Sequence, residues 1–143
     1  MVSGQTNKAR VVWSGEELNF TGHLGSGYHF ELGGGENKVG GSPMEFLLAG
    51  AAGCTAVDVV MILQKQRQHV SGVEVAMTGK RAETMPKVYT EIDLVYLVRG
   101  DQVDPKAVER AISLSKEKYC SATAMLQRGG VKINTSYHIE QDD

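Results

Sequence analysis

Two cysteines, Cys54 and Cys120, are the residues of this chain whose type suits redox chemistry. They lie far apart in the sequence, in no spacing that is typical of a metal site. In a reducing compartment a structural disulfide is not expected, so any pairing between them would be transient and chemical. Either cysteine alone would also suit a buried structural position. The presence of two, in distinct settings, favours a reactive pair.

The local settings of the two cysteines differ. Cys54 follows a run of alanine and glycine over residues 49–53, so another backbone or a ligand could approach its sulfur closely. Cys120 stands directly before a predicted short helix over residues 121–127, with Ser121 as the expected cap. Free N–H groups at a helix start stabilise an anion, which predicts a lowered pKa for the Cys120 thiol.

The element that must position Cys54 is a long helix predicted over residues 42–68. Ser42 can cap it, Pro43 suits its first position, and Glu45 can close a capping box. No residue from Phe46 to Val57 is charged. A helix that is apolar on all sides is expected to be buried on all sides.

This helix needs more cover than one chain of 143 residues provides. The length corresponds to a single domain, residues 1–143, and a small domain commonly shields only one stripe of each helix. We therefore expect the helix to pack against its own copy in a symmetric dimer, with sheets around the pair. A membrane span is not expected, because Glu45 and Asp58 interrupt the helix and its uncharged stretch is shorter than the roughly 20 residues that a bilayer needs.

Strand patterns flank the long helix. The predicted strands cover residues 9–13, 17–22, 27–32, 73–78, 88–99 and 131–140, the last three with clear alternation of apolar and polar residues. A second helix is expected from Asp104-Pro105 to about Tyr119, with Val108, Ala111, Ile112 and Ser115 on its inner face. The glycine-rich segment 33–41 lacks a phosphate-binding signature and is expected to be a flexible surface loop. An α+β fold follows.

Composition excludes several partners. The net charge of −2 offers no electrostatic footprint for nucleic acid. The N-terminus has no apolar signal region and the C-terminus no lipidation motif, so a cytoplasmic protein without membrane attachment is expected. The chain has four histidines, His23, His29, His69 and His138, and their spacing shows no pair that could bind a metal. Neither a metal site nor a cofactor is predicted.

The stretch SPMEFLLAGAAGCTAVDVVMILQKQR, followed downstream by LSKEKYCSATAML, resembles the OsmC/Ohr family and, within it, the YhfA-like branch. The similarity runs from ARVVW to the final strand. The resemblance implies an OsmC-like intertwined homodimer, with two long central helices enclosed by antiparallel sheets and active sites at the subunit interface.

The same resemblance implies a peroxiredoxin-like activity in oxidative stress defence, the reduction of hydroperoxides and of organic ones especially. Cys54 would attack the O–O bond and become a sulfenic acid, with which Cys120 would condense to a disulfide. The reductant would be a dithiol, often a lipoylated protein.

The sequence departs from the family at two supporting residues. Catalytic members carry a glutamate ten residues before the first cysteine, where this chain has Met44. Glu45 is adjacent, but nine residues at about 100° each place it half a turn away from Cys54. The family arginine lies in the loop before the helix, where this chain offers only Lys38; Arg10 is a possible substitute.

Asp58 lies four residues after Cys54 and therefore on the same helix face. A carboxylate there disfavours a thiolate unless a cation intervenes. Asp58 is interpreted either as a hydrogen-bonded residue at the dimer seam or as a proton acceptor for Cys54.

Three functions are compatible with these residues. The first is a cysteine-dependent hydroperoxide reductase of the OsmC type. The second is a non-catalytic OsmC-like dimer that binds a small apolar or thiol-reactive ligand at the subunit interface, which the missing arginine and glutamate favour. The third is an unrelated enzyme such as a thioesterase, for which no histidine or aspartate motif stands at the helix start.

Overall fold

The computed structural model describes residues 4–142, and their helices and strands confirm the α+β class. The chain forms two compact units, one ending at Leu47 and one beginning at Leu48, which are described in turn. Whether they act as the single predicted domain stays a prediction.

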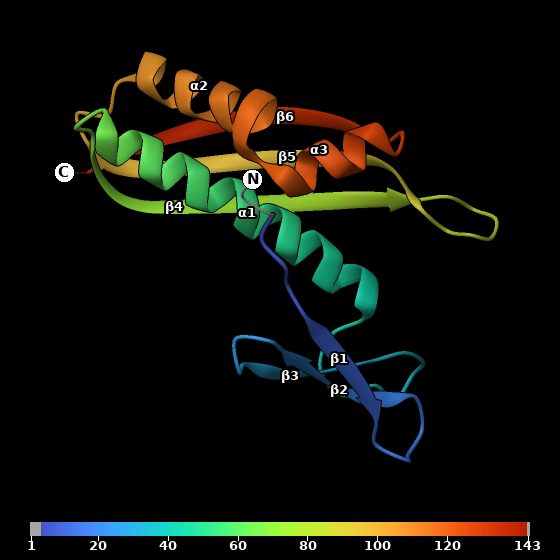
Figure 1. Ribbon diagram of the computed structural model, residues 1–143. Coiled ribbons are helices and arrows are strands. Elements are labelled where there is room, and N and C mark those ends of the chain that lie inside the picture. The colour runs from blue at the N-terminus through green and yellow to red at the C-terminus, as the bar shows by residue number, and fades with distance from the viewer. Residues whose placement is uncertain (1–3, 143) are drawn as a thin grey trace. The chain divides into compact units, whose positions relative to one another are not determined.

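The first unit is an antiparallel sheet of β1 (Ala9–Trp13), β2 (Asn19–Leu24) and β3 (His29–Gly33) in that order (Figure 1). The first strand has the predicted bounds. The second begins two residues later than predicted because Glu17 takes a positive φ of 52° and extends the turn. Apolar side chains stay exposed on this sheet, including Trp13 at 58%.

The glycine-rich segment is anchored rather than free. Leu32 and Gly41 form an isolated parallel bridge, and the Asn19 side chain accepts a backbone hydrogen bond from the segment. Gly40 has a φ of 78°, and a Cβ there would lie 2.1 Å from the Glu31 carbonyl oxygen. Only glycine permits both features.

The long helix α1 (Pro43–Lys65) begins as predicted and ends earlier. The Ser42 N–H donates to the Glu45 carboxylate at 2.9 Å, and the Glu45 N–H donates to the Ser42 hydroxyl at 3.3 Å, which is the predicted capping box. A turn with Arg67 at a φ of 59° then ends the helical path. His69, directly after the predicted helix, is the first residue of the strand β4 (His69–Arg81).

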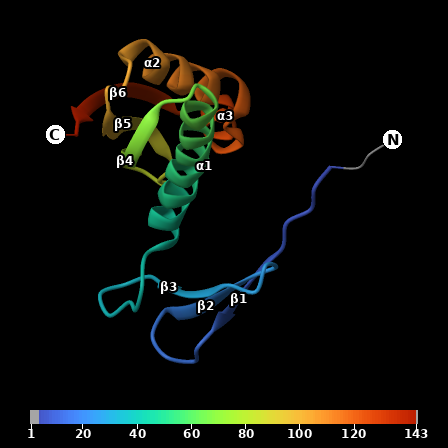
Figure 2. The ribbon, with the colours of Figure 1, turned by 90° about the vertical axis from the view of Figure 1, so that its left-hand side faces the viewer.

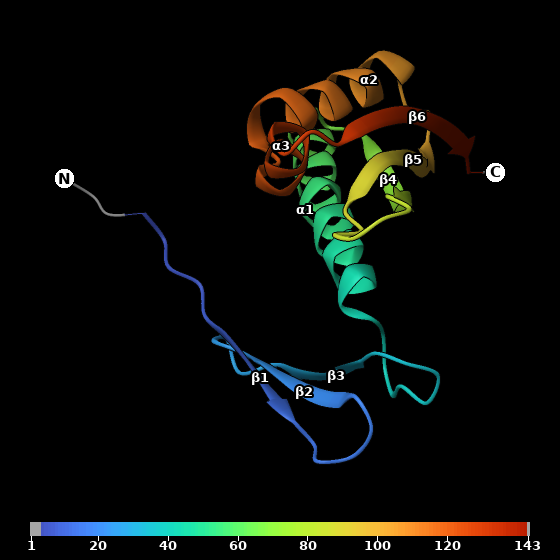
Figure 3. The same cartoon turned by 90° about the vertical axis from the view of Figure 1, so that its right-hand side faces the viewer.

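The second unit has one mixed sheet, ordered β4 (His69–Arg81), β5 (Tyr89–Asp101) and β6 (Lys132–Gln141). β4 and β5 are antiparallel, but β5 and β6 are parallel, so the prediction of wholly antiparallel sheets is wrong here. The reason is the crossover through α2 (Pro105–Leu114), the π-helical turn η1 (Ser115–Tyr119) and α3 (Ser121–Arg128). Figures 2 and 3 show α1, α2 and α3 on the same face of this sheet.

The core of this unit lies between that sheet face and the helices. The inner face of β5 is buried as predicted, at Ile92, Leu94, Tyr96 and Val98. Strict alternation along residues 88–99 would place Tyr89 on the face opposite Ile92, but Tyr89 is only 6% exposed. A register shift in the pairing between Lys80 and Arg81 interrupts the alternation there.

Only one stripe of α1 is buried within the chain, consisting of Ala51, Thr55, Val59 and Leu63. Val57 is 59% exposed and Met61 is 49% exposed, so burial on all sides is not achieved by a single chain. By length and composition α1 could also cross a membrane, with a mean hydropathy of 2.1 in its most apolar window. Its hydrogen-bonded Thr55 and Asp58 fit a helix that packs against protein.

Candidate redox site

The structure brings the two predicted cysteines together. Cys54 lies on α1 beside the buried stripe and is partly exposed. Cys120 lies between η1 and α3 and is 2% exposed. Both are free thiols, and Cys54 lies near enough to Cys120 to raise the pKa of the Cys120 thiol.

Cys120, and not Ser121, is the N-cap of α3. Its sulfur accepts a hydrogen bond from the Thr123 N–H at 3.5 Å, and the Thr123 hydroxyl donates to the Cys120 carbonyl at 3.3 Å. Ser121 is the first residue of the helix itself. The sequence suggested Ser121 because serine is the commoner cap.

The prediction of a lowered pKa for Cys120 is wrong. Burial raises the pKa of this thiol above its ordinary value and outweighs the hydrogen bonds from Thr123, which lower it. The neighbouring Cys54 raises it further. Cys120 is therefore a protonated thiol at neutral pH.

This direction predicts how alkylation depends on pH. At pH 7.5 iodoacetamide is expected to label the more exposed Cys54 well before Cys120, as measured by peptide mapping. Because the thiolate is the reacting form, the rate of Cys120 labelling should rise by about tenfold per pH unit. This rate should keep rising beyond the pH at which the labelling rate of an ordinary thiol, with a pKa of about 8.5, becomes constant. If Cys120 in the folded protein were labelled at pH 8 as fast as in urea-denatured protein, that result would contradict the raised pKa of Cys120.

A buried chain of hydroxyl groups lies beside the pair. The Thr55 hydroxyl is 2.7 Å from the Tyr96 hydroxyl and 2.8 Å from the Ser115 hydroxyl. The Ser115 hydroxyl donates to an Asp58 carboxylate oxygen at 2.8 Å. We call these four residues the Asp58 network. Of the predicted supporting residues, Asp58 is the one that the structure places in hydrogen-bonded contact with this core.

The other predicted supporting residues belong to the first unit. Arg10 lies in β1, Lys38 in the glycine-rich segment, and Glu45 in the capping box, where hydrogen bonds from Ser42 lower its pKa. A role for any of them beside Cys54 stays a prediction.

A pocket of about 360 Å³ adjoins the Asp58 network, although neither cysteine lines it. Asp58 and Met61 line it from α1, and Tyr119, the residue before Cys120, lines it from η1. Arg110 also lines it and contributes a cation to the wall of this pocket. Arg110 was not predicted from the sequence, because the resemblance places the family arginine in the loop before α1.

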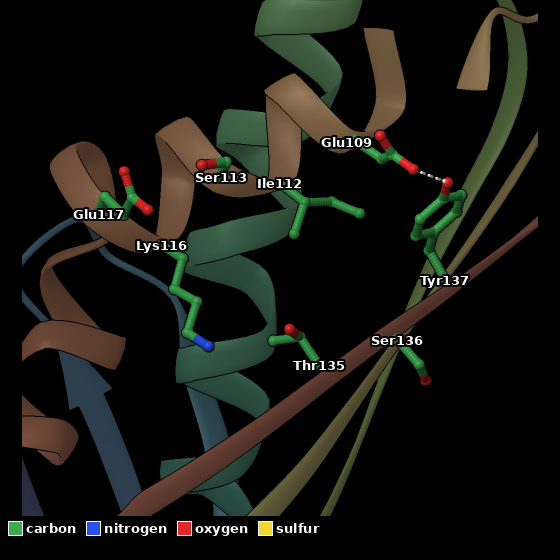
Figure 4. A pocket seen from close by; sticks show the side chains of 8 residues that line it. All are labelled: Glu109, Ile112, Ser113, Lys116, Glu117, Thr135, Ser136 and Tyr137. Atoms are coloured by element: carbon green, nitrogen blue, oxygen red, sulfur yellow. Dashed lines mark hydrogen bonds between the residues drawn. The ribbon is translucent and has the colours of Figure 1, made fainter. Parts of the chain in front are cut away.

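A second pocket, of about 300 Å³, lies between α2 and β6 (Figure 4). The Tyr137 hydroxyl donates to Glu109 at 2.5 Å, and this hydrogen bond raises the Tyr137 pKa. Lys116 also lines the pocket. Neither a cysteine nor a residue of the Asp58 network lines this pocket, so it is separate from the redox site.

Sequence reasoning also missed Thr55 and Tyr96 as site residues. Thr55 gave the one signal, a polar side chain next to Cys54 within an otherwise uncharged and mostly apolar stretch. Within residues 4–142 no group of three or more histidine, cysteine, aspartate or glutamate side chains could hold a metal ion.

The fold and the site define an α+β protein with a long central helix and a paired dithiol. Comparison with known proteins confirms the resemblance: the family model for OsmC-like protein matches residues 33–136, so the chain belongs to this family. Protein YhfA of Escherichia coli K12 is 44% identical over 132 residues, which cover 92% of this chain and 97% of that protein.

Solved structures share the fold. A hypothetical protein from Aquifex aeolicus VF5 is 33% identical, with a TM-score of 0.87, covering 98% of this chain and 100% of that one. The organic hydroperoxide resistance protein OhrB of Bacillus subtilis is 16% identical, with a TM-score of 0.63, covering 94% and 98%. The second likeness concerns the fold alone.

Proposed function

We propose that this protein reduces organic hydroperoxides through Cys54 and Cys120. The observation that carries the proposal is the proximity of a partly exposed and a buried thiol. The Cys54 thiolate attacks the O–O bond, which leaves a sulfenic acid and an alkoxide that takes a proton from water to give the alcohol. The Cys120 sulfur then attacks the Cys54 sulfur, which forms the disulfide and expels the hydroxyl as water with the Cys120 proton.

The surroundings support this division of roles. Cys54 is the more accessible of the two cysteines, whereas Cys120 is buried nearby and protonated. The pocket beside Asp58 has apolar walls at Met61 and Leu114 that suit the organic part of a hydroperoxide. A dithiol, such as a lipoylated protein, would reduce the disulfide in the cytoplasm as part of oxidative stress defence.

The proposal includes a homodimer built on α1. Its exposed face carries Val57 and Met61, which a second copy would cover. Gly50 and Gly53 lie on α1 with nothing within 4 Å of an added Cβ. Each glycine costs the helix about 1 kcal/mol relative to alanine, so their presence favours a close approach of two backbones.

The test is a titration with cumene hydroperoxide. One equivalent should consume both free thiols and leave an intramolecular Cys54–Cys120 disulfide, as measured by thiol titration and peptide mapping. A parallel titration with the same amount of hydrogen peroxide tests whether the organic group of the hydroperoxide contributes to the reaction. Unchanged free thiols after one equivalent would refute the enzymatic proposal.

The second candidate is a non-catalytic dimer that binds a small apolar ligand. It is favoured by Met44, which stands where catalytic members of the family carry their glutamate, ten residues before Cys54. Two results together would support the binding protein over the hydroperoxide reductase. The thiols would not react with the hydroperoxide, and 2-phenyl-2-propanol would raise the melting temperature of a Cys54→Ser protein.

A further inference from the structure

The Asp58 network joins three elements at one buried place. Thr55 and Asp58 come from α1, Tyr96 from β5, and Ser115 from the first position of η1. The Thr55, Tyr96 and Ser115 side chains belong to residues that are 0% exposed. Buried hydroxyl groups that satisfy one another fix the relative position of the elements that carry them.

The hydrogen bonds of the network run in one direction. Ser115 donates its single hydroxyl proton to the Asp58 carboxylate oxygen. Thr55 must then donate to Ser115, and Tyr96 must donate to Thr55. Asp58 thus fixes the donor order of the whole chain, and loss of its acceptor would leave the Ser115 proton without this partner and the order undetermined.

The network reaches both cysteines through the backbone. Thr55 directly follows Cys54 in α1. The Ser115 carbonyl accepts a hydrogen bond from the Cys120 N–H at 2.7 Å, which closes the π-helical turn. Ser115 therefore binds α1 through its side chain and Cys120 through its backbone. Single π-type turns are uncommon and often occur at functional sites.

We propose that Asp58, Ser115, Thr55 and Tyr96 are positioning residues that hold η1 against α1 so that the Cys120 sulfur meets the Cys54 sulfur. The network sets how readily the disulfide forms. This inference rests on the dithiol of the proposed function and requires no hydroperoxide. Oxidised glutathione can form the same disulfide, taking two electrons and both thiol protons and leaving two molecules of reduced glutathione.

The test is the equilibrium constant of the full-length protein with glutathione buffers, measured by quenching and separation of the thiol and disulfide forms. Thr55→Val keeps the shape and removes the hydroxyl, and is expected to lower the constant by roughly tenfold, the scale of one or two lost buried hydrogen bonds. Thr55→Ser keeps the hydroxyl, so its equilibrium constant should stay within about twofold of that of the parent protein. Tyr96→Phe repeats the test should Thr55→Val fail to fold.

Two matched variants separate positioning from general destabilisation and from charge. Val59→Ala removes core volume from the same buried stripe, and should lower the melting temperature without changing the equilibrium constant. Asp58→Asn keeps an acceptor oxygen and removes the charge, so it should behave as the parent protein, whereas Asp58→Leu should behave as Thr55→Val.

Three results would overturn the inference. One is an unchanged constant in both Thr55→Val and Tyr96→Phe. Another is a loss in Val59→Ala equal to that in Thr55→Val. The third is no disulfide with glutathione in the parent protein. Failure of the peroxide titration alone would refute the proposed function and leave the positioning role standing.

Discussion

A Cys54→Ser variant is expected to lose hydroperoxide reduction by at least about 10³-fold, the scale on which removal of a nucleophile acts. A serine hydroxyl does not attack the O–O bond, and the remaining thiol, Cys120, is buried and has a raised pKa. The measurement is the disappearance of cumene hydroperoxide with excess dithiothreitol as reductant.

The matched variant is Cys120→Ser. Serine is a strong N-cap residue, so the start of α3 should persist without the second sulfur. This variant should consume one equivalent of hydroperoxide and accumulate a sulfenic acid at Cys54, trapped with dimedone and located by peptide mapping. A sulfenic acid at Cys120 in the Cys54→Ser variant would instead reverse the proposed roles.

Local patterns predicted most of the second unit. The alternation in β5 and β6 and the inner stripe of α2 follow from burial on one side of each element, which sequence periodicity records. The direction of β6 was not predictable, because the same alternation serves parallel and antiparallel strands. The crossover that sets it depends on where the helices dock.

The redox site was only partly predictable for the same reason. The chemistry of Cys54 and Cys120 and their local settings follow from the sequence, but the pKa of Cys120 depends on burial that tertiary packing creates. Thr55, Tyr96 and Ser115 come from three separate elements, and each alone has an ordinary structural explanation. Their meeting point appears only in the folded chain.

The Val57→Asp substitution is expected to raise the dissociation constant of the proposed dimer by at least about a hundredfold. Val57 is 59% exposed within one chain, on the apolar face that a second copy would cover. An uncompensated charge buried there costs about 3–5 kcal/mol, and each factor of ten in the dissociation constant corresponds to about 1.4 kcal/mol. A symmetric interface contains the substitution twice. Sedimentation velocity over a concentration series measures the shift.

The matched control is Ser113→Asp, which adds the same charge to an exposed position on α2. It should leave the dissociation constant unchanged, so a shift confined to Val57→Asp assigns the interface to the exposed face of α1. The melting temperature of Val57→Asp should also fall and become independent of protein concentration, because dimerisation stabilises the folded state by mass action. A parent protein that is monomeric at micromolar concentration, with α1 folded, would contradict the dimer. The exposed apolar face of α1 would then need another occupant.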